Sequence, residues 1–336
     1  MRVRFGVIGL NHGHIYRQVE ILREAGAEFV SFYAPEPELC KEFTDRVRGA
    51  KLARSEAEIL EDNSIQIITG AGVPNERGPL AVRAMKHGKD VLTDKPGCTT
   101  LEQLAEIRRV QQETKRIYSI YYGRLDSRST TKADELVKAG AIGRVIHVMA
   151  LGPHKTNLPN RPSWFFKRAQ YGGILCDIAA HDFDYFVHFA NELNAEVVAA
   201  QVANYKHPEY PELEDFGDAT VRGAGATGYF RVDWLTPKGL TVFGDCRLLL
   251  LGTDGFIEMR HCIDLAGRDG GDHLFLTDHK STQYVDCRNV EVSFGKKLIA
   301  DVTHRTATAQ NQAVCFAAAE LSLKAQAMAT RLGNLK

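Results

Sequence analysis

The sequence predicts an α/β protein in which a doubly wound parallel sheet is followed by an α+β region with an open, mainly antiparallel sheet. Strand-like and helix-like segments alternate through the first 122 residues, which is the pattern of parallel strands joined by helical crossovers. After residue 195, strand-like segments follow one another without helices between them, which favours antiparallel pairing. A chain of 336 residues is long enough for two such domains.

The first predicted domain is built from short apolar strands and amphipathic helices. We predict strands over residues 2–10, 27–34, 64–73, 89–96 and 116–123, and helices over 14–27, 37–47, 78–88 and 99–115. Thr99 or Thr100 is placed to cap the last of these helices. Ligands of a parallel sheet bind outside the carboxyl ends of its strands, so the loops that follow these strands are the expected location of a site.

The pattern changes after Tyr122. We predict a helix over 130–143, a strand over 144–151, a loop rich in Pro and Asn over 152–164, a helix over 177–190, strands over 195–205, 218–224, 227–235, 240–252 and 255–260, and a helix over 307–330. The predicted domains are therefore residues 1–122 and 123–336, with the closing helix at 305–330 able to pack back on the first domain.

Composition excludes several classes of partner. Lys+Arg and Asp+Glu both number 42, and no run of basic residues indicates a nucleic-acid surface. No segment has the apolar length of a membrane span or the pattern of a secretory leader. The seven cysteines are scattered and odd in number, as expected of reduced thiols. We therefore expect a cytoplasmic protein that binds a small molecule, and no nucleic-acid or membrane partner.

A glycine turn follows the first predicted strand. Gly9, Leu10, Asn11, His12, Gly13 and His14 stand where a dinucleotide-binding turn reads G-x-G-x-x-G. Gly9 keeps the tight-turn position, Asn11 tolerates unusual dihedral angles, and Gly13 is expected to supply the backbone freedom that His14 lacks. We expect the turn to bind a pyrophosphate at the helix N-terminus, although alone it also fits an ordinary strand–helix connection. The two histidines have no carboxylate or cysteine nearby in the sequence, so we expect no metal site.

The residues at the end of the second predicted strand indicate whether the protein prefers NAD or NADP. An acidic residue is expected there to hold the ribose hydroxyls, but Ala34 stands in its place and Glu36 follows. The nearest cation that could receive a 2′-phosphate is Lys41. This pattern favours NAD without excluding NADP. The alternative is that Glu36 is only a solvated residue at a helix start.

Two further motifs carry titratable side chains. Lys95 follows a buried strand, where a nicotinamide would bind, and the alternative is a surface lysine before a turn. Asp177 and His181 are four residues apart and share a face if they lie on one helix. A histidine beside a carboxylate is a plausible proton acceptor, against the alternative of a helix-terminal Asp and a partly buried His. Gly172 and Gly173 ahead of that helix allow close approach of a ligand.

In this order, the motifs resemble those of the Gfo/Idh/MocA oxidoreductases. Residues 88–96, GKDVLTDKP, look like the family's G-K-H-V-x-x-E-K-P, and residues 139–145 look like its S-G-x-I-G-x-V. Residues 172–184 look like its G-G-x-x-x-D-x-x-x-H-x-x-D. The ordered match runs along most of the chain and is far more specific than any one motif. Three departures are Ala34 for a ribose-binding Asp, Asp94 for Glu, and Gly78 for the His of the loop T-P-N-x-x-H.

The resemblance implies a Rossmann domain, a nicotinamide cofactor, and hydride transfer at a carbinol or carbonyl carbon of a sugar, polyol or related derivative. It implies that Lys95, Asp177 and His181 are catalytic. His181 would act as general base, Lys95 would hydrogen-bond the same substrate oxygen, and Asp177 would orient His181 or bind a neighbouring hydroxyl. It also implies a cis Lys95–Pro96 bond. Cofactor contacts are expected at Gly9, Leu10, Asn11, His12, Gly13, His14, Ala34, Glu36, Gly72, Val73, Pro74, Asn75, Asp94, Lys95 and Pro96.

Substrate contacts are expected mainly from the loop before the catalytic motif. The candidates are Lys95, Arg124, His154, Lys155, Asn157, Arg161, Trp164, Asp177 and His181, with His273 and His279 as weaker ones. The alternative is a polar loop in which Trp164 only anchors packing. Two other functions stay open: an enzyme that retains NAD and oxidises a sugar transiently for elimination or hydrolysis, and a regulator that binds dinucleotide without turnover. The resemblance also implies a homodimer or homotetramer through the second sheet.

Overall fold

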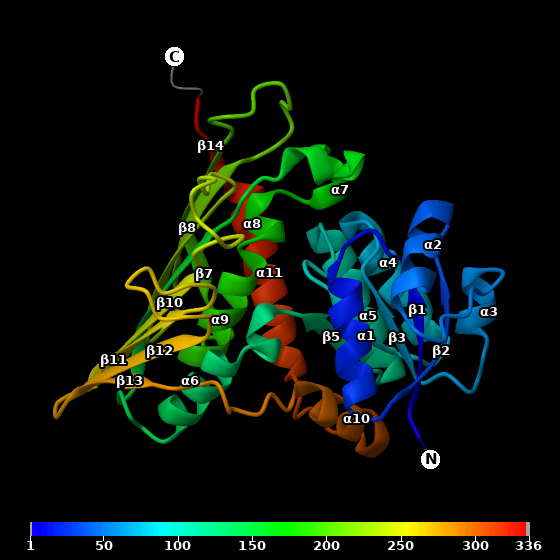
Figure 1. The fold of residues 1–336 in the computed structure, drawn as a ribbon, viewed down its shortest axis with the longest axis horizontal. Coiled ribbons are helices and arrows are strands. Elements are labelled where there is room, and N and C mark those ends of the chain that lie inside the picture. Colours follow the sequence, from blue (N-terminus) through cyan, green and yellow to red (C-terminus); the bar gives the residue numbers. More distant parts are fainter. Residues whose placement is uncertain (1, 334–336) are drawn as a thin grey trace. The chain divides into compact units, whose positions relative to one another are not determined.

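The chain forms two compact units in a computed structural model that describes residues 2–333 (Figure 1). The first unit contains the chain up to Tyr121 together with Ser293–Phe316. The second contains Tyr122–Val292 and the chain from Ala317 onward. Among the described residues, no helix has the length and apolar character needed to cross a bilayer.

The first unit is a five-stranded parallel sheet with helices on both faces (Figure 1). The strands lie in the order β2-β1-β3-β4-β5, with β1 at Arg4–Ile8, β2 at Glu28–Tyr33, β3 at Ile67–Gly70, β4 at Asp90–Asp94 and β5 at Tyr118–Tyr121. The helices are α1 (His14–Glu24), α2 (Pro37–Arg46), α3 (Glu56–Leu60), α4 (Pro74–Lys86), α5 (Leu101–Thr114) and α10 (Phe294–His304). The predicted parallel sheet is confirmed, and β3, β4 and β5 are buried along their whole length, as expected of a sheet covered on both faces.

Local sequence explains most of these boundaries. Thr100 caps α5 by accepting a hydrogen bond from the backbone N–H of Gln103. Helix α4 begins at Pro74, earlier than predicted, because proline suits the first helical position. Helices α3 and α10 were not predicted. Helix α10 packs on α1, where a Cβ on Gly295 would lie 2.7 Å from the Ile21 carbonyl oxygen.

Two glutamines close the outer edge of β5. The side chain of Gln312 accepts from the backbone N–H of Tyr118 (3.0 Å) and donates to its carbonyl oxygen (2.9 Å). Gln310 makes the same pair of hydrogen bonds to Ile120, at 3.0 and 3.2 Å. Each amide therefore occupies the place of a neighbouring strand's backbone and satisfies an edge that would otherwise be open.

The second unit is a nine-stranded mixed sheet, mostly antiparallel, as the sequence predicted. Its order is β13-β12-β11-β10-β6-β9-β8-β7-β14, and β6 with β9 and β7 with β14 are parallel pairs. The strands are β6 (Val145–Pro153), β7 (Glu196–Ala203), β8 (Phe216–Arg222), β9 (Thr227–Asp233), β10 (Arg247–Gly252), β11 (Gly255–Arg260), β12 (His273–Asp278), β13 (Thr282–Val285) and β14 (Thr330–Arg331). The helices are α6 (Arg128–Lys138), α7 (Arg168–Tyr171), α8 (Ile174–Asp177), α9 (Ala180–Ala190) and α11 (Gln312–Met328). Helices α6, α8 and α9 pack on one face of this sheet.

Two predicted elements of this unit are wrong. The strand predicted over 240–252 begins only at Arg247, because the preceding residues contact the loop after β6: Phe243 accepts a hydrogen bond from Lys155, and Gly244 lies against the Pro153 backbone. The helix predicted over 177–190 is two helices, interrupted between Asp177 and Ala180. Strands β12 and β13 were not predicted.

Candidate active site

The glycine turn after β1 depends on Gly9. Gly9 has φ +84°, and a Cβ there would lie 2.8 Å from the Cα of Gly72, so only glycine fits. Its N–H donates to the Tyr33 carbonyl and its carbonyl accepts from Ala71 N–H, both at 3.0 Å. Gly13 has φ −61° with nothing within 4 Å of a Cβ position. The expectation that Gly13 supplies special backbone freedom is therefore wrong, because α1 begins there with ordinary helical angles.

The acidic group beside the turn comes from Glu36. Asn11 donates from Nδ2 to Oε1 of Glu36 at 2.8 Å, while Oε2 of Glu36 is buried with no hydrogen-bond partner. Ala34 is buried, and its carbonyl accepts from the Cys40 thiol. A buried carboxylate oxygen without a partner is costly in a folded protein, and a ribose hydroxyl would satisfy it. These residues therefore fit a dinucleotide whose ribose is held by Glu36 rather than at position 34.

A polar cluster joins the turn to the end of β4. His12 and His14 donate from Nδ1 to the two oxygens of Asp94, at 2.7 and 2.8 Å, and the Arg77 guanidinium lies 3.2 Å from Asp94. Burial lowers the pKa of His12 to about 4, so His12 is neutral. Burial alone would raise the pKa of Asp94, but Arg77 and the histidines outweigh it and hold the pKa well below its usual range. The premise that no carboxylate lies near the histidines is wrong.

His12, His14 and Asp94 are residue types that bind metals, but the negative charge of Asp94 is already balanced by Arg77. Ligand atoms of His12, His14 and Asp94 lie within 4.8 Å of one another. Both Asp94 oxygens accept hydrogen bonds from the histidines, and Arg77 supplies the positive charge that a cation would bring. The geometry therefore favours a hydrogen-bonded ion pair that fixes the strand end bearing Lys95.

Lys95 is buried, and the Lys95–Pro96 bond is cis, as the resemblance implies. Arg77 donates to the Lys95 carbonyl and, at 2.8 Å, to the Gly72 carbonyl. The alternative of a surface lysine is therefore wrong. The neighbouring loop is also ordered: Val73 precedes α4, Pro74 begins it, and the Asn75 carbonyl accepts from Gln103 at 2.8 Å. Leu10, beside the glycine turn, is a buried core residue.

In the second unit, Asp177 ends α8 and His181 lies in the first turn of α9. Gly173 has φ +94°, and a Cβ there would lie 2.3 Å from the Gln326 amide. The Gln326 carbonyl oxygen accepts from the backbone N–H of Leu175 at 2.8 Å. Gly173 therefore makes room for Gln326. Close approach of a ligand to the Gly172–Gly173 pair stays a prediction.

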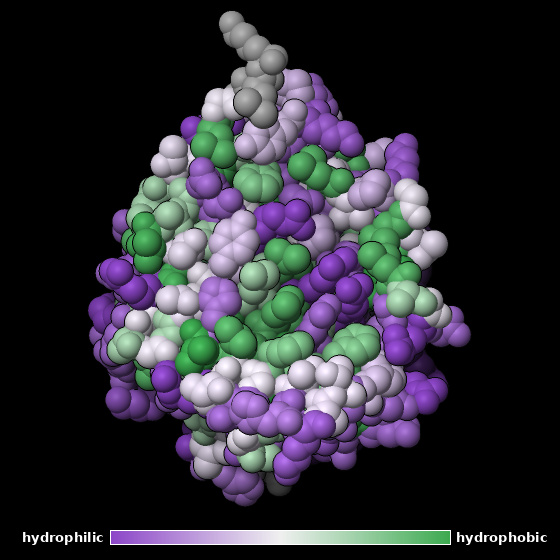
Figure 2. All heavy atoms as spheres, turned by 90° about the vertical axis from the view of Figure 1, so that its left-hand side faces the viewer, coloured by the Kyte–Doolittle hydropathy of each residue, from purple (hydrophilic) through white to green (hydrophobic). Residues whose placement is uncertain are grey.

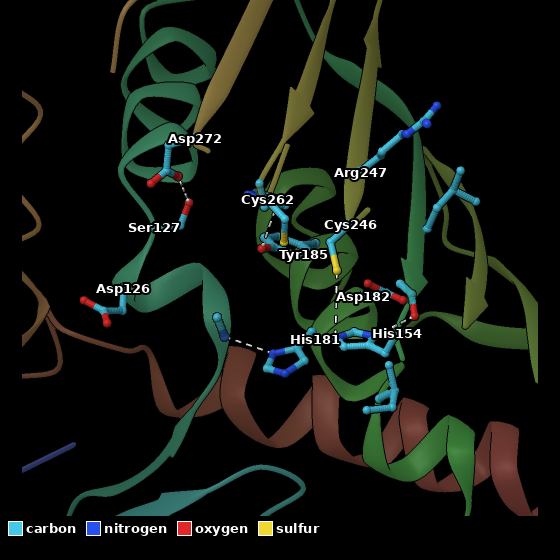
Figure 3. Close-up of a pocket in the computed structure, with 15 residues that line it drawn as sticks. Asp126, Ser127, His154, His181, Asp182, Tyr185, Cys246, Arg247, Cys262 and Asp272 are labelled. Carbon is cyan, nitrogen blue, oxygen red and sulfur yellow. Dashed lines mark hydrogen bonds between the residues drawn. The ribbon is translucent and has the colours of Figure 1, made fainter. Parts of the chain in front are cut away.

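A backbone group sets the tautomer of His181. The N–H of Gly123 donates to Nδ1 of His181 at 2.9 Å (Figure 3). Because that nitrogen is the acceptor, the neutral ring carries its hydrogen on Nε2. His181 therefore presents an N–H donor, which differs from the general base that the sequence predicted.

His181 lines a cavity of about 280 Å³ between α9 and the ends of β6, β10 and β11 (Figure 3). The lining residues are Gly123, Asp126, Ser127, Leu151, Gly152, His154, Ile178, His181, Asp182, Tyr185, Cys246, Arg247, His261, Cys262 and Asp272. His154 donates from Nδ1 to the Gly152 carbonyl at 2.9 Å, so its Nε2 is an acceptor. His154 and His181, two of the predicted substrate residues, therefore line the same cavity. His154 has an acceptor nitrogen and His181 a donor.

Most of the other predicted substrate residues have structural partners. Arg124 forms a two-point ion pair with buried Asp184, at 2.6 and 3.1 Å. Lys155 donates to the Leu240 carbonyl, and Asn157 accepts from Asn160 in a left-handed turn. The Arg161 guanidinium lies over the rings of Phe165 and Trp234, which contact each other edge to face, and Trp164 is buried. These side chains do not line the cavity, nor do His273 and His279.

Sequence reasoning missed most of the cavity wall. Asp126, Ser127, Tyr185, Cys246, Cys262 and Asp272 come from separate segments that carry no shared motif. Asp182 also lines the cavity, and its position directly after His181 is the signal in the sequence that indicates it.

Comparisons with known proteins agree with both units. Residues 3–122 match the oxidoreductase family with an NAD-binding Rossmann fold, and residues 130–258 match the GFO/IDH/MocA C-terminal domain. The chain belongs to the Gfo/Idh/MocA oxidoreductase family. The predicted nicotinamide dinucleotide cofactor is confirmed at the level of this family.

Several relatives within the Gfo/Idh/MocA family have named activities. The chain is 24% identical to scyllo-inositol 2-dehydrogenase (NAD(+)) of Bacillus subtilis over 77% of this chain and 75% of that protein. It is 27% identical to myo-inositol 2-dehydrogenase of Thermotoga maritima over 59% of this chain and 58% of that protein. A solved putative oxidoreductase from Erwinia carotovora atroseptica superposes with a TM-score of 0.96 and 42% identity, covering 99% of this chain and 100% of that one.

One departure from the Gfo/Idh/MocA loop motif has a steric explanation. At Gly78, where the family's loop carries His, a Cβ would lie 3.2 Å from Cβ of Cys98 and 3.3 Å from Gln103. A side chain at this position would therefore press on Cys98 and Gln103, which would have to shift. Gln103 instead ties this loop to α5 through the Asn75 carbonyl.

Proposed function

We propose that the protein catalyses NAD(P)-dependent hydride transfer at a carbinol or carbonyl carbon of a sugar, polyol or related derivative. The observation that carries this proposal is that both catalytic motifs are intact in well-formed surroundings. Lys95 follows a strand end held by the glycine turn, and His181 presents a fixed donor to a small-molecule-sized cavity. The activities named for the inositol dehydrogenases are of this type.

The cofactor would be held by the turn that begins at Gly9, by the N-terminus of α1, and by Glu36. Backbone N–H groups at a helix start suit a pyrophosphate. The carboxylate of Glu36 suits ribose hydroxyls and repels a 2′-phosphate, which favours NAD over NADP. When bound, the nicotinamide supplies the carbon that accepts or donates the hydride.

The catalytic residues then have these roles. His181 donates from Nε2 to the substrate oxygen, and Lys95 binds the same oxygen and exchanges its proton as the hydride moves. If His181 accepted that proton at Nε2, its neutral ring would need hydrogen on Nδ1, where the Gly123 N–H already points. Asp177 binds a neighbouring hydroxyl or orients the substrate.

A substrate screen tests the function. Purified protein is given scyllo-inositol, myo-inositol, D-xylose or levoglucosan with NAD⁺ or NADP⁺, and reduced cofactor is followed by absorbance. We expect turnover with NAD⁺. NADH binding without turnover of any compound would favour the regulator, and a tightly retained NAD with no net redox change would favour transient oxidation.

Variants of His181 test its role. Loss of one oxyanion donor lowers kcat by about 10²–10³, so we expect that effect from His181→Ala. His181→Gln should recover part of the rate, because its amide can donate the same hydrogen bond. Neither variant should change the shape of the pH profile of kcat/KM or the affinity for NADH. A glutamine variant as inactive as alanine, with the pH dependence abolished, would show that His181 is the base.

We also propose a cytoplasmic homo-oligomer assembled through the open face of the nine-stranded sheet. Hydrophobic side chains gather on this side of the second unit (Figure 2). Val198 on β7, Leu251 on β10 and Phe256 on β11 are each more than 40% exposed. Exposed apolar patches of this kind mark interaction surfaces. All seven cysteines are unbridged, which suits a reducing compartment.

A further inference from the structure

Two cysteines, Cys246 and Cys262, contact each other in the wall of the cavity that His181 lines (Figure 3). Their thiols are hydrogen-bonded to each other, and neither is part of a disulfide. Both are partly exposed, whereas the other cysteines in the described part of the chain are buried. Oxidation of a thiol requires access to the oxidant. These two thiols are therefore the ones that a dissolved oxidant reaches most readily.

The strand register brings the two cysteines together. Arg247 of β10 pairs with Arg260 of β11, and beyond this pair the backbone N–H of His261 donates to the Cys246 carbonyl at 3.0 Å. Cys262 lies one residue further, in the bend that follows β11, where side chains no longer alternate between faces. Strands lie about 5 Å apart and rise about 3.3 Å per residue, so such a diagonal pair is within the roughly 4.4–6.8 Å between Cα atoms that a disulfide spans.

The two thiols differ in acidity. The hydrogen bond from the Cys246 thiol, together with one from the Cys246 backbone, outweighs burial and lowers the pKa of Cys262. The same thiol–thiol hydrogen bond and burial raise the pKa of Cys246 well above its usual value. Cys262 therefore ionises first and is the better nucleophile, while Cys246 stays protonated.

His154 is positioned to accept the proton of Cys246. Its Nδ1 donates to the Gly152 carbonyl, so Nε2 is the acceptor, and this atom lies 3.9 Å from Sγ of Cys246 (Figure 3). A thiol attacks sulfur as its thiolate. A neutral imidazole beside Cys246 therefore supplies the base that this less acidic thiol needs.

We propose that Cys246 and Cys262 form an intramolecular disulfide when the protein meets hydrogen peroxide, and that this cross-link weakens ligand binding in the cavity that His181 lines. The Cys262 thiolate attacks one peroxide oxygen, the O–O bond breaks, and a sulfenic acid and hydroxide form. The Cys246 sulfur then attacks the sulfenic sulfur, its proton passes to His154, and the hydroxyl group leaves as water. The two thiols lose two electrons, and the peroxide gains them to become two waters.

The cross-link would alter the cavity directly. It consumes the S–H group whose hydrogen bond His154 accepts, and it ties the start of β10 to the bend after β11. Both places are in the cavity wall. The effect on substrate rests on the proposed function, whereas the thiol chemistry is independent of it.

Mass spectrometry of the full chain tests the thiol chemistry without substrate. Reduced protein is treated with hydrogen peroxide, and we expect a species lighter by about 2 Da whose non-reducing peptide map joins Cys246 to Cys262. Dithiothreitol should restore both thiols. Cys287→Ser, which removes a buried cysteine, should give the same cross-link. Absence of the Cys246–Cys262 cross-link, or a cross-link between other cysteines, overturns the proposal.

Serine variants test the roles of the two thiols. After peroxide treatment, Cys246→Ser should retain Cys262 as a sulfenic acid that dimedone labels, because no thiol is beside it to condense. Cys262→Ser should show little labelling of Cys246. Equal labelling of the two variants would overturn the assignment of Cys262 as the attacking thiol. Thermal unfolding and NADH binding verify that each variant folds.

The effect on the cavity is measured with scyllo-inositol and NAD⁺. Loss of one hydrogen bond weakens binding by up to about tenfold, so we expect oxidation of the wild type to raise KM by up to that factor and dithiothreitol to reverse it. Cys262→Ser should keep its KM after the same treatment. An unchanged KM in fully cross-linked wild type overturns the effect on binding.

These outcomes are distinct from those that test the proposed function. If the reduced wild type turns over no substrate, the proposed function fails, and the peptide map still decides whether the disulfide forms. Saturation-transfer NMR of scyllo-inositol then replaces KM. Weaker binding after oxidation supports the inference, and equal binding, or none to the reduced protein, overturns the effect on the cavity.

Discussion

Replacing Arg124 by methionine separates a structural role from a ligand-binding one. Sequence analysis placed Arg124 among the substrate contacts, but its guanidinium is ion-paired with Asp184 at 2.6 and 3.1 Å. The two side chains are 10% and 0% exposed. Removing the cation would leave Asp184 as an uncompensated buried charge.

The cost of that change follows from the burial of both partners. Breaking a buried ion pair by removing one partner costs about 3–5 kcal/mol. In a cooperative unit of about 150–250 residues, each kcal/mol shifts Tm by about 2–4 °C, so Arg124→Met should lower Tm by about 6–20 °C. The double variant Arg124→Met/Asp184→Leu should regain much of this loss, because no charge is left buried.

Differential scanning calorimetry at fixed pH and salt measures these shifts. Arg222→Met is the matched control, because Arg222 pairs with Glu196 while both side chains are more than 60% exposed. Such surface pairs contribute about 0–1 kcal/mol. If Arg124→Met melts like Arg222→Met and instead raises KM, Arg124 is a ligand residue and the reasoning is refuted.

Three further predictions concern the glycine turn, its histidine and the open sheet. Gly9→Ala should abolish NADH binding measured by fluorescence, because φ +84° and the contact with Gly72 exclude a Cβ, whereas Gly13→Ala should leave Tm unchanged. The pKa of His12 falls from 6.5 unfolded to about 4 folded, so acid favours the unfolded state and stability is lost as pH falls between these values. Urea unfolding at pH 7 and pH 4.5 should show a loss of up to about 3 kcal/mol that His12→Gln reduces; the side chain is 25% exposed, which makes this an upper limit. An equal loss of stability in the wild type and in His12→Gln would show that His12 is not its source. Leu251→Lys with Phe256→Lys should convert the oligomer to monomer in light scattering, and an unchanged mass would place the interface elsewhere.

The sequence predicts those parts of the fold that local patterns determine. Apolar strands with helices between them identified the parallel sheet, and one of the two residues proposed as the cap of α5, Thr100, is the cap in the structure. Residues 240–246 were misread as strand because apolar Leu240, Val242 and Phe243 look like one, although their partners lie in the loop after β6. Strand pairing depends on contacts distant in the sequence, which periodicity does not report.

The residues of the candidate site could be predicted where they belong to a sequence motif. They could not be predicted where their hydrogen-bond partners come from distant parts of the chain. Lys95 was singled out by its position after a buried strand, and Asp177 and His181 by their spacing of four residues; their catalytic roles stay a prediction. The tautomer of His181 depends on a backbone N–H 58 residues away, and the carboxylate partner of His12 is 82 residues away. An acidic residue was expected at the end of the second strand, where the sequence has Ala34. Glu36, two residues later, is held there by a hydrogen bond from Asn11, which the sequence does not reveal.

The hydrogen bonds from Gln310 and Gln312 to β5 have a consequence for folding during translation, because these residues are synthesised long after the strand. Gln310 and Gln312 are translated after the whole of Tyr122–Val292, yet they complete the outermost strand of the first unit. Until they arrive, a nascent chain carries an unpaired strand edge, which is the feature most prone to wrong association. The first unit is therefore not an independent N-terminal module, and a fragment cut after Tyr121 lacks part of its own structure.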